Sequence, residues 1–235
     1  MPCYISWNIY KLKCFQPFRE PSPTTTKSDN PKIQAVQFNS QAVAAFKLQD
    51  FHKAIELFTE AICLCLFYIG FASLSRVYQT ALDAEVASYH TNRGVAYSRT
   101  RNYMPALADF NAATTANNGI ATIKILVQIA RCRLFLGSPS SALLAVQDAL
   151  CLDPTDSNVH ALKKRVVELQ GHMNGYKDAM VHKCWRMARS SYESCLRAYA
   201  QEDGDPPIDV QCWRIEILIA ERDWDTAVTA TGCVL

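Results

Sequence analysis

Small and aromatic residues recur along the chain in a fixed order that predicts amphipathic helices. Residues 51–61 read FHKAIELFTEA and residues 103–113 read YMPALADFNAA, so aromatic, small, aromatic and small residues occupy the same four places in both. Spacings of three and four positions put these side chains on one face of a helix. The chain therefore contains an internal repeat of helical segments.

The first small residue of this pattern measures the length of the repeat. We call Ala54, Ala106, Ala142, Ala188 and Ala227 the repeat alanines; their successive position numbers differ by 52, 36, 46 and 39. Each difference is a 34-residue unit with extra positions in a loop. The residues four places later are Phe58, Phe110, Val146, Tyr192 and Thr231, and those seven places later are Ala61, Ala113, Ala149, Cys195 and Val234. The pattern is weakest in its last copy.

This pattern with its 34-residue period resembles the tetratricopeptide repeat (TPR). The run Asn92-Arg93-Gly94 with Tyr97, and the run Leu152-Asp153-Pro154 that closes the third copy, add to the resemblance. It covers roughly residues 34–235. It implies an all-α fold, a TPR-type right-handed superhelix of stacked antiparallel helix pairs, in which neighbouring pairs share a continuous core. Such an array offers a groove for binding rather than a reaction chamber.

Local composition predicts the organisation of the chain. Residues 1–31 are interpreted as a flexible leader and linker, and residues 32–235 as a TPR array of about five helical hairpins. An insertion is expected at about 67–84, with Tyr68 and Phe71 either in a buried helix or in an exposed contact patch. The last hairpin is cut short at Leu235, which leaves open whether the chain is a fragment of a longer protein.

Charge and motifs narrow the possible functions. The formal net charge of +2 argues against nucleic-acid binding, and the apolar run at 61–72 is too short to cross a membrane. The ten cysteines include no Cys-x-x-Cys pair, which favours reduced thiols and a cytoplasmic location. No phosphate-binding glycine loop, zinc helix or nucleophile elbow is present. We therefore expect no catalytic residue, no metal, no cofactor and no enzymatic activity.

The TPR resemblance also indicates candidate binding residues. In that family a two-carboxylate clamp holds the C-terminal tails of the Hsp70 and Hsp90 heat-shock chaperones. It uses a lysine and an asparagine on the first repeat, an asparagine on the second, and a lysine and an arginine on the third. The corresponding residues here are Asn39 and Val43, then Asn92, then Lys124 and Gln128. Arg131 and Arg133 offer positive charge one turn further along.

Three functions follow from these residues. The first is a co-chaperone-like adaptor that binds chaperone tails or client peptides in a concave groove; the run from Tyr89 through Pro154 looks most like the array of J-domain co-chaperones, although no His-Pro-Asp motif occurs. The second is a general scaffold that binds a folded partner through the insertion or the convex face, with a non-functional clamp. The third, an RNA-binding repeat, is disfavoured by the charge. The bound peptide, a following J domain or enzyme domain, and the oligomeric state stay open.

Overall fold

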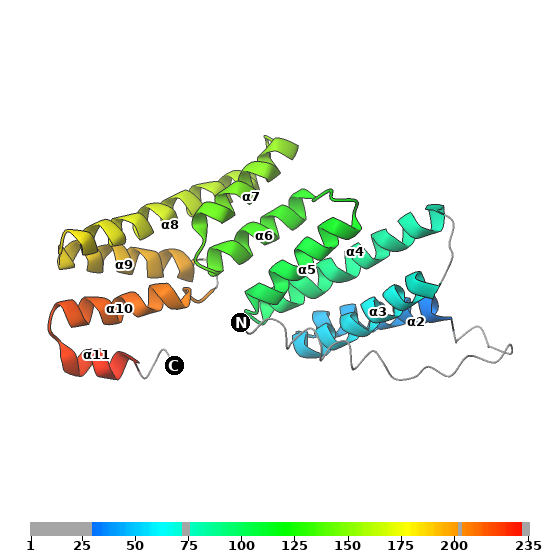
Figure 1. Cartoon of the computed structure of the whole chain (residues 1–235), viewed down its shortest axis with the longest axis horizontal. Helices are drawn as coiled ribbons and strands as arrows, with labels where there is room; N and C mark the ends of the chain where they lie inside the picture. Colours follow the sequence, from blue (N-terminus) through cyan, green and yellow to red (C-terminus); the bar gives the residue numbers. More distant parts are fainter. Residues whose placement is uncertain (1–29, 72–75, 202–203, 232–235) are drawn as a thin grey trace. The chain divides into compact units, whose positions relative to one another are not determined.

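The computed structural model describes residues 30–71, 76–201 and 204–231, and within these ranges it contains ten helices and no strand (Figure 1). The all-α prediction is therefore confirmed. The helices are α2 (Pro31–Lys47), α3 (Phe51–Phe71), α4 (Arg76–Arg99), α5 (Tyr103–Ala116), α6 (Ile123–Phe135), α7 (Pro139–Leu152), α8 (Ser157–Val181), α9 (Trp185–Ala200), α10 (Ile208–Ala220) and α11 (Trp224–Thr231). Residues 1–29 of the predicted leader, and the side chains of Tyr68 and Phe71, lie outside the description.

The helices belong to two compact units, Met1–Ala96 and Tyr97–Leu235, which divide within α4. In the first unit α2 packs against α3. Their shared core consists of Ala42, Ala45, Ala54 and Phe58, with Val43 packed against it. The Asn30 side chain caps α2 by accepting a hydrogen bond from the Lys32 amide at 2.9 Å.

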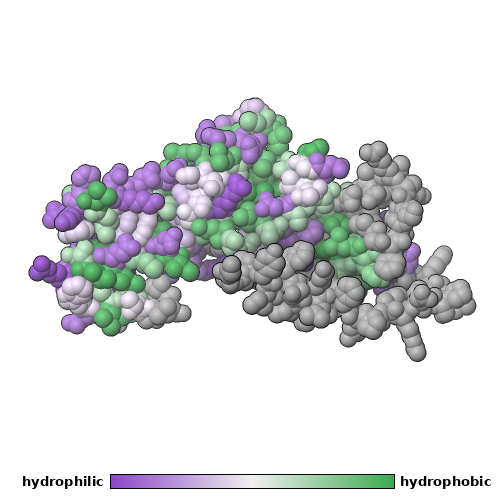
Figure 2. Space-filling model, in the orientation of Figure 1, coloured by the Kyte–Doolittle hydropathy of each residue, from purple (hydrophilic) through white to green (hydrophobic). Residues whose placement is uncertain are grey.

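In the second unit each helix from α5 to α11 packs against the next one along the chain. This is the nearest-neighbour stacking expected of a helical repeat, since one hairpin cannot bury its apolar face alone. In the view of Figure 2, the surface over α8 is mostly hydrophilic. The apolar side of α8 faces inward, where Val159, Leu162 and Val166 are buried.

The repeat alanines lie on the buried faces of their helices. All five are buried, and four of them have no exposed surface. A methyl side chain lets two helix backbones approach, and Phe58, Phe110 and Val146 fill the space one turn away. In the last copy Thr231 is exposed. The weakening of the sequence pattern there is thus accompanied by a weaker core.

The turn inside each hairpin repeats the same backbone geometry. A residue five places before each repeat alanine has a positive φ: Gln49, Arg101, Gly137, Lys183 and Arg222, with values from 56° to 75°. The next residue along donates its amide hydrogen back across the turn: Asp50 to Ala45, Asn102 to Tyr97, Ser138 to Arg133, Cys184 to Ala179, and Asp223 to Leu218. This is the Schellman ending of a helix, which usually places glycine at the positive φ. Here only the third turn has glycine.

One helix is longer than the sequence pattern predicts. A helix is expected from about Ser157 to Gln170, with a turn around Gly171 and His172, but α8 continues through both to Val181. Asp156 caps its start by accepting from the amides of Asn158 and Val159. Gly171 and Gly175 stay helical because Met173 between them and Tyr176 after them are buried. Packing thus overrides the local cost of glycine in a helix.

We expect the close helix approach to limit the size of the repeat alanines. Ala106→Leu should lower the free energy of unfolding by about 1–3 kcal/mol, because the added atoms meet a fully packed contact. Ala108→Leu, at an exposed position of the same helix, is the matched control and should change stability by less than about 0.5 kcal/mol. Urea unfolding measures both. Equal effects of the two substitutions would contradict the packing role.

We also expect the strained turns to gain from glycine. Lys183 is exposed with a φ of 56°, so Lys183→Gly should raise the free energy of unfolding by roughly 0.5–1 kcal/mol. Lys177→Gly, at an exposed site inside α8, should lower it by about 1 kcal/mol because glycine is a poor helix former. The opposite signs are the test, read from thermal unfolding of the two variants. Destabilisation by both would mean that the turn is not strained.

Candidate functional site

The sequence-predicted binding residues are distributed over both units. Asn39 lies on α2 and Asn92 on α4, in the first unit. Lys124, Gln128 and Arg131 lie on α6, in the second unit.

The residues on α6 form one polar stripe. Lys124, Gln128 and Arg131 follow one another at four and three positions, which is the spacing of one helical face. Lys124 and Arg131 are exposed and Gln128 is half-buried. The opposite side of α6 is buried, so the helix presents this stripe to solvent. The structure thus brings these three predicted residues together.

Local sequence explains why α6 starts where it does. The Thr122 side chain accepts a hydrogen bond from the Ile125 amide at 3.4 Å and so caps the helix. This places Lys124 in the first turn and Arg131 two turns later. The sequence offers Arg133 beside Arg131, but Arg133 Nη1 donates to the carbonyl of Ser141 on α7 at 2.9 Å. Arg131 is therefore the arginine of the stripe.

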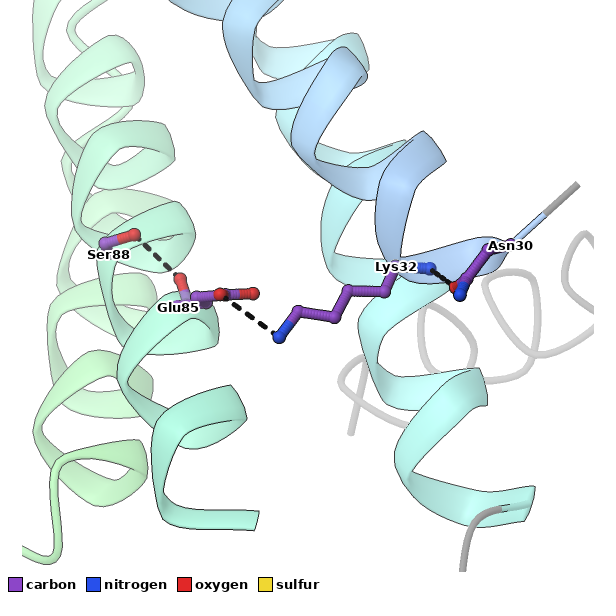
Figure 3. A network of polar contacts seen from close by, with 4 residues as sticks. All are labelled: Asn30, Lys32, Glu85 and Ser88. Atoms are coloured by element: carbon purple, nitrogen blue, oxygen red, sulfur yellow. Dashed lines mark hydrogen bonds and ion pairs between the residues drawn. The ribbon is translucent and has the colours of Figure 1, made fainter. Parts of the chain in front are cut away.

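In the first unit an ion pair joins α2 to α4. Lys32 Nζ lies 3.4 Å from Glu85 Oε1 (Figure 3), and the Ser88 hydroxyl donates to the backbone carbonyl of Glu85 at 2.8 Å. Both helices run in the same direction away from this pair (Figure 3). Asn39 follows Lys32 by seven positions, and Asn92 follows Glu85 by seven. Each amide therefore lies on the same face of its helix as one member of the ion pair, two turns further along that helix.

Two oxygens in this region are buried without a hydrogen-bond donor. They are Oδ1 of Asn39 and Oε2 of Glu85. A buried acceptor that has lost its water costs on the order of 1–3 kcal/mol unless a donor reaches it. Asn39 Oδ1 is therefore an unsatisfied acceptor, which an outside donor reaches only if the surrounding side chains move.

Beside the Lys32–Glu85 pair lie two buried titratable side chains, Cys65 of α3 and Tyr89 of α4. Burial, with a smaller contribution from Glu85 and an opposing one from Lys32, raises the pKa of the Cys65 thiol to about 11. Burial also raises the pKa of the Tyr89 hydroxyl to about 12, helped by Cys65 and Glu85. Both groups stay neutral at pH 7, so this cluster is structural rather than nucleophilic.

Sequence reasoning missed this cluster. Lys32, Cys65 and Glu85 belong to three different helices, and no local spacing connects them. Among the described residues, no group of three or more histidine, cysteine or acidic side chains is arranged to hold a metal ion. None of the described helices is both long enough and apolar enough to cross a membrane.

Comparison with known proteins places the fold. The chain matches no protein-family model and no curated protein sequence. The TPR domain of P58(IPK) matches with a TM-score of 0.60 and 17% identity, over 86% of this chain and 51% of that one. The C-terminal TPR-containing domain of a Plasmodium falciparum protein described as an FK506-binding protein matches with a TM-score of 0.53 and 14% identity, over 64% of this chain and 97% of that one.

The fold is therefore that of the tetratricopeptide repeat. The 34-residue period, the buried repeat alanines and the five like turns agree with these two structural matches. The chain has the TPR fold, as its sequence predicts. At these identities the likeness establishes the fold, and the ligand has to be argued from this chain's own residues.

We expect the buried Cys65 thiol to make stability fall at alkaline pH. Its pKa is higher in the folded than in the unfolded chain, so its stabilising contribution is complete below about pH 9 and is lost as the pH rises to about 11. A shift of this size corresponds to roughly 2–3 kcal/mol. Cys65→Ala should therefore flatten the decrease in unfolding free energy between pH 9 and 11, as measured by urea unfolding at each pH.

Two further variants control this measurement. Cys195 is a buried thiol of the second unit, whose burial also raises its pKa to about 11, so Cys195→Ala should flatten the pH dependence as well. Cys151 is exposed, and Cys151→Ala should leave the pH dependence as in the unsubstituted chain. An unchanged slope in Cys65→Ala would show that this thiol is not desolvated.

Proposed function

We propose that this chain is a non-catalytic protein-interaction module that binds acidic peptide tails or client segments along its first-helix faces. It is then a co-chaperone-like adaptor, and its ligands are the C-terminal tails of the Hsp70 or Hsp90 heat-shock chaperones. The binding residues are Lys124, Gln128 and Arg131 with Asn39 and Asn92. The observation that carries the proposal is the solvent-facing polar stripe of α6.

The stripe suits an acidic ligand. Lys124 and Arg131 are exposed, and neither makes an ion pair within the part of the chain that the structure describes. A lysine or arginine that donates to a carboxylate forms a charge-assisted hydrogen bond, which contributes about 1.5–3 kcal/mol. Gln128 lies between the two cations and adds a neutral donor. Together they can hold two neighbouring carboxylates of an extended peptide.

The two asparagines suit the peptide backbone. A side-chain amide both donates and accepts, which matches the alternating C=O and N–H groups of an extended chain. Asn39 occupies a position where the clamp resemblance has a lysine, and its Oδ1 is buried without a donor. We therefore assign it a bond to a peptide N–H rather than to a carboxylate.

The affinity should be moderate. Relative to the full clamp pattern, the chain lacks one lysine, one asparagine and one arginine, which are replaced by Asn39, Val43 and Gln128. Each lost charge-assisted contact costs roughly a factor of ten or more. Micromolar rather than nanomolar binding is the expected range.

A second function is favoured by a separate observation in the second unit. The helices α9 and α11 each pack against α10, and two adjoining hollows of about 330 and 360 Å³ lie at these three helices. Both hollows are lined by Arg214 and Thr226. A scaffold that binds a folded partner would use this surface, and the clamp positions would then have no role.

Calorimetric titration of the whole chain with an acidic C-terminal tail peptide tests the first function. We expect micromolar binding, at least tenfold weaker binding in Lys124→Ala and in Arg131→Ala, and loss of binding when the peptide carries a C-terminal amide. Lys164→Ala, an exposed lysine of α8, is the matched control and should bind as the unsubstituted chain does. No binding, or equal loss in all three variants, would reject the stripe and favour the scaffold function.

A further inference from the structure

The exposed stripe of α6 ends abruptly at an aromatic residue. Phe135 follows Arg131 by four positions and therefore continues the same face, yet it is only 9% exposed where Arg131 faces solvent. Its ring stacks on Tyr103 with centroids 4.7 Å apart and lies 6.0 Å from the ring of Tyr199. Another segment of the chain therefore covers the stripe at its Phe135 end.

The cover is a short segment of the chain, Gly204–Pro207, which we call the strap. Gly204 lies directly on the ring of Phe135, so closely that any Cβ at this position would overlap three ring carbons. At the other end of the strap, Pro207 lies against Gly137, where an added Cβ would be 3.4 Å from the proline ring. The strap thus follows the end of α6 and its turn.

Polar contacts hold the strap on both sides. Arg101 Nη1 donates to Asp205 Oδ2 in an ion pair between exposed side chains. Gln211 of α10 donates to the carbonyl of Pro206 at 2.7 Å. Just before the strap, the Tyr199 hydroxyl donates to the carbonyl of Leu134 at 3.1 Å. These contacts fix the strap to α6 and to the turn before α5.

The strap breaks the nearest-neighbour rule of a helical repeat. Arg101 and Tyr103 belong to the turn and second helix of the second hairpin, whereas Asp205 joins the fourth hairpin to the fifth. In a solenoid each repeat ordinarily contacts only the next one. The Arg101–Asp205 pair therefore joins hairpins that are not neighbours, while Gly204 and Pro207 contact the third hairpin, whose first helix carries the polar stripe.

The position and charge of the strap suggest a role in binding. The Asp205 carboxylate lies near the end of the face that carries Lys124 and Arg131. It forms an ion pair with Arg101. An acidic peptide running along the stripe toward Phe135 meets this carboxylate and the strap backbone. The negative charges of the peptide and of Asp205 repel each other at that point.

We propose that the strap is an internal competitor that occupies one end of the α6 stripe. An acidic peptide must displace it to reach the ring of Phe135 and the side chain of Arg101. This regulation rests on the proposed peptide-binding function. The exposed Arg101–Asp205 pair holds the strap weakly, because exposed ion pairs contribute little. The contact of Gly204 with the Phe135 ring is the second restraint, and a larger residue at this position would have to displace the ring.

Two variants loosen the strap by different means. Gly204→Ala removes the fit on Phe135, and Asp205→Asn removes the ion pair with almost no change of shape. Gly171→Ala is the matched control, because a Cβ at that glycine of α8 meets no atom within 4 Å. Each is examined without ligand by amide hydrogen exchange over residues 131–138, and with an acidic C-terminal tail peptide by calorimetry.

We expect faster exchange at the Gly137 and Ser138 amides in Gly204→Ala, and tighter peptide binding by at least threefold. Asp205→Asn should tighten binding two- to fivefold at low salt, and this gain should shrink as salt rises. Gly171→Ala should match the unsubstituted chain in both measurements. If the unsubstituted chain binds the peptide and both strap variants bind it equally or more weakly, the competitor role is wrong while the proposed function stands. If no chain binds the peptide, both are wrong, whatever the exchange rates show.

Discussion

The close approach of two helices at a buried alanine is the constraint on which the rest of this molecule depends. A methyl group is the largest side chain that permits this approach, and the aromatic or branched residue one turn later completes the contact. Both requirements recur once in every repeat, so they determine where each hairpin lies along the chain. The first helix of each hairpin then has one side buried and the other available for polar residues, as α6 shows.

The turns join these contacts with one repeated backbone geometry. In each hairpin the first helix ends with a residue in the left-handed conformation, and the next residue makes the same backbone hydrogen bond across the turn. Because four of the five positions are not glycine, the geometry is imposed by the packing of the two helices rather than chosen by the residue. The tertiary contact thus determines the local conformation. Packing overrides local preference in α8 as well, which is why this helix continues through Gly171 and Gly175.

Much of the fold could be predicted from the sequence, because its main determinants are local and periodic. The repeat alanines and their aromatic partners depend only on spacing, and they predict the all-α TPR fold. The length of α8 could not be predicted, since the burial of Met173 and Tyr176 beyond its glycines is a tertiary effect. The leader at 1–31 and the insertion at about 67–84 stay predictions. The candidate site divides in the same way: the stripe on α6 follows from helical spacing, whereas the Arg133 contact with α7, the Lys32–Glu85 pair and the strap arise only after hairpins have stacked.

The left-handed turn residues have a consequence for the stereochemistry of the chain. A D-amino acid has the mirror-image backbone preference, so a positive φ is unstrained for it, whereas an L-residue with a positive φ is strained. At Gln49, Lys183 and Arg222, chemical inversion of a single stereocentre would keep every side-chain atom and relieve the backbone. At each of these three hairpin turns the mirror-image residue is the better fit to the backbone. A semisynthetic protein made in this way would separate the cost of the turn from the contribution of its side chain, which no genetically encoded substitution can do.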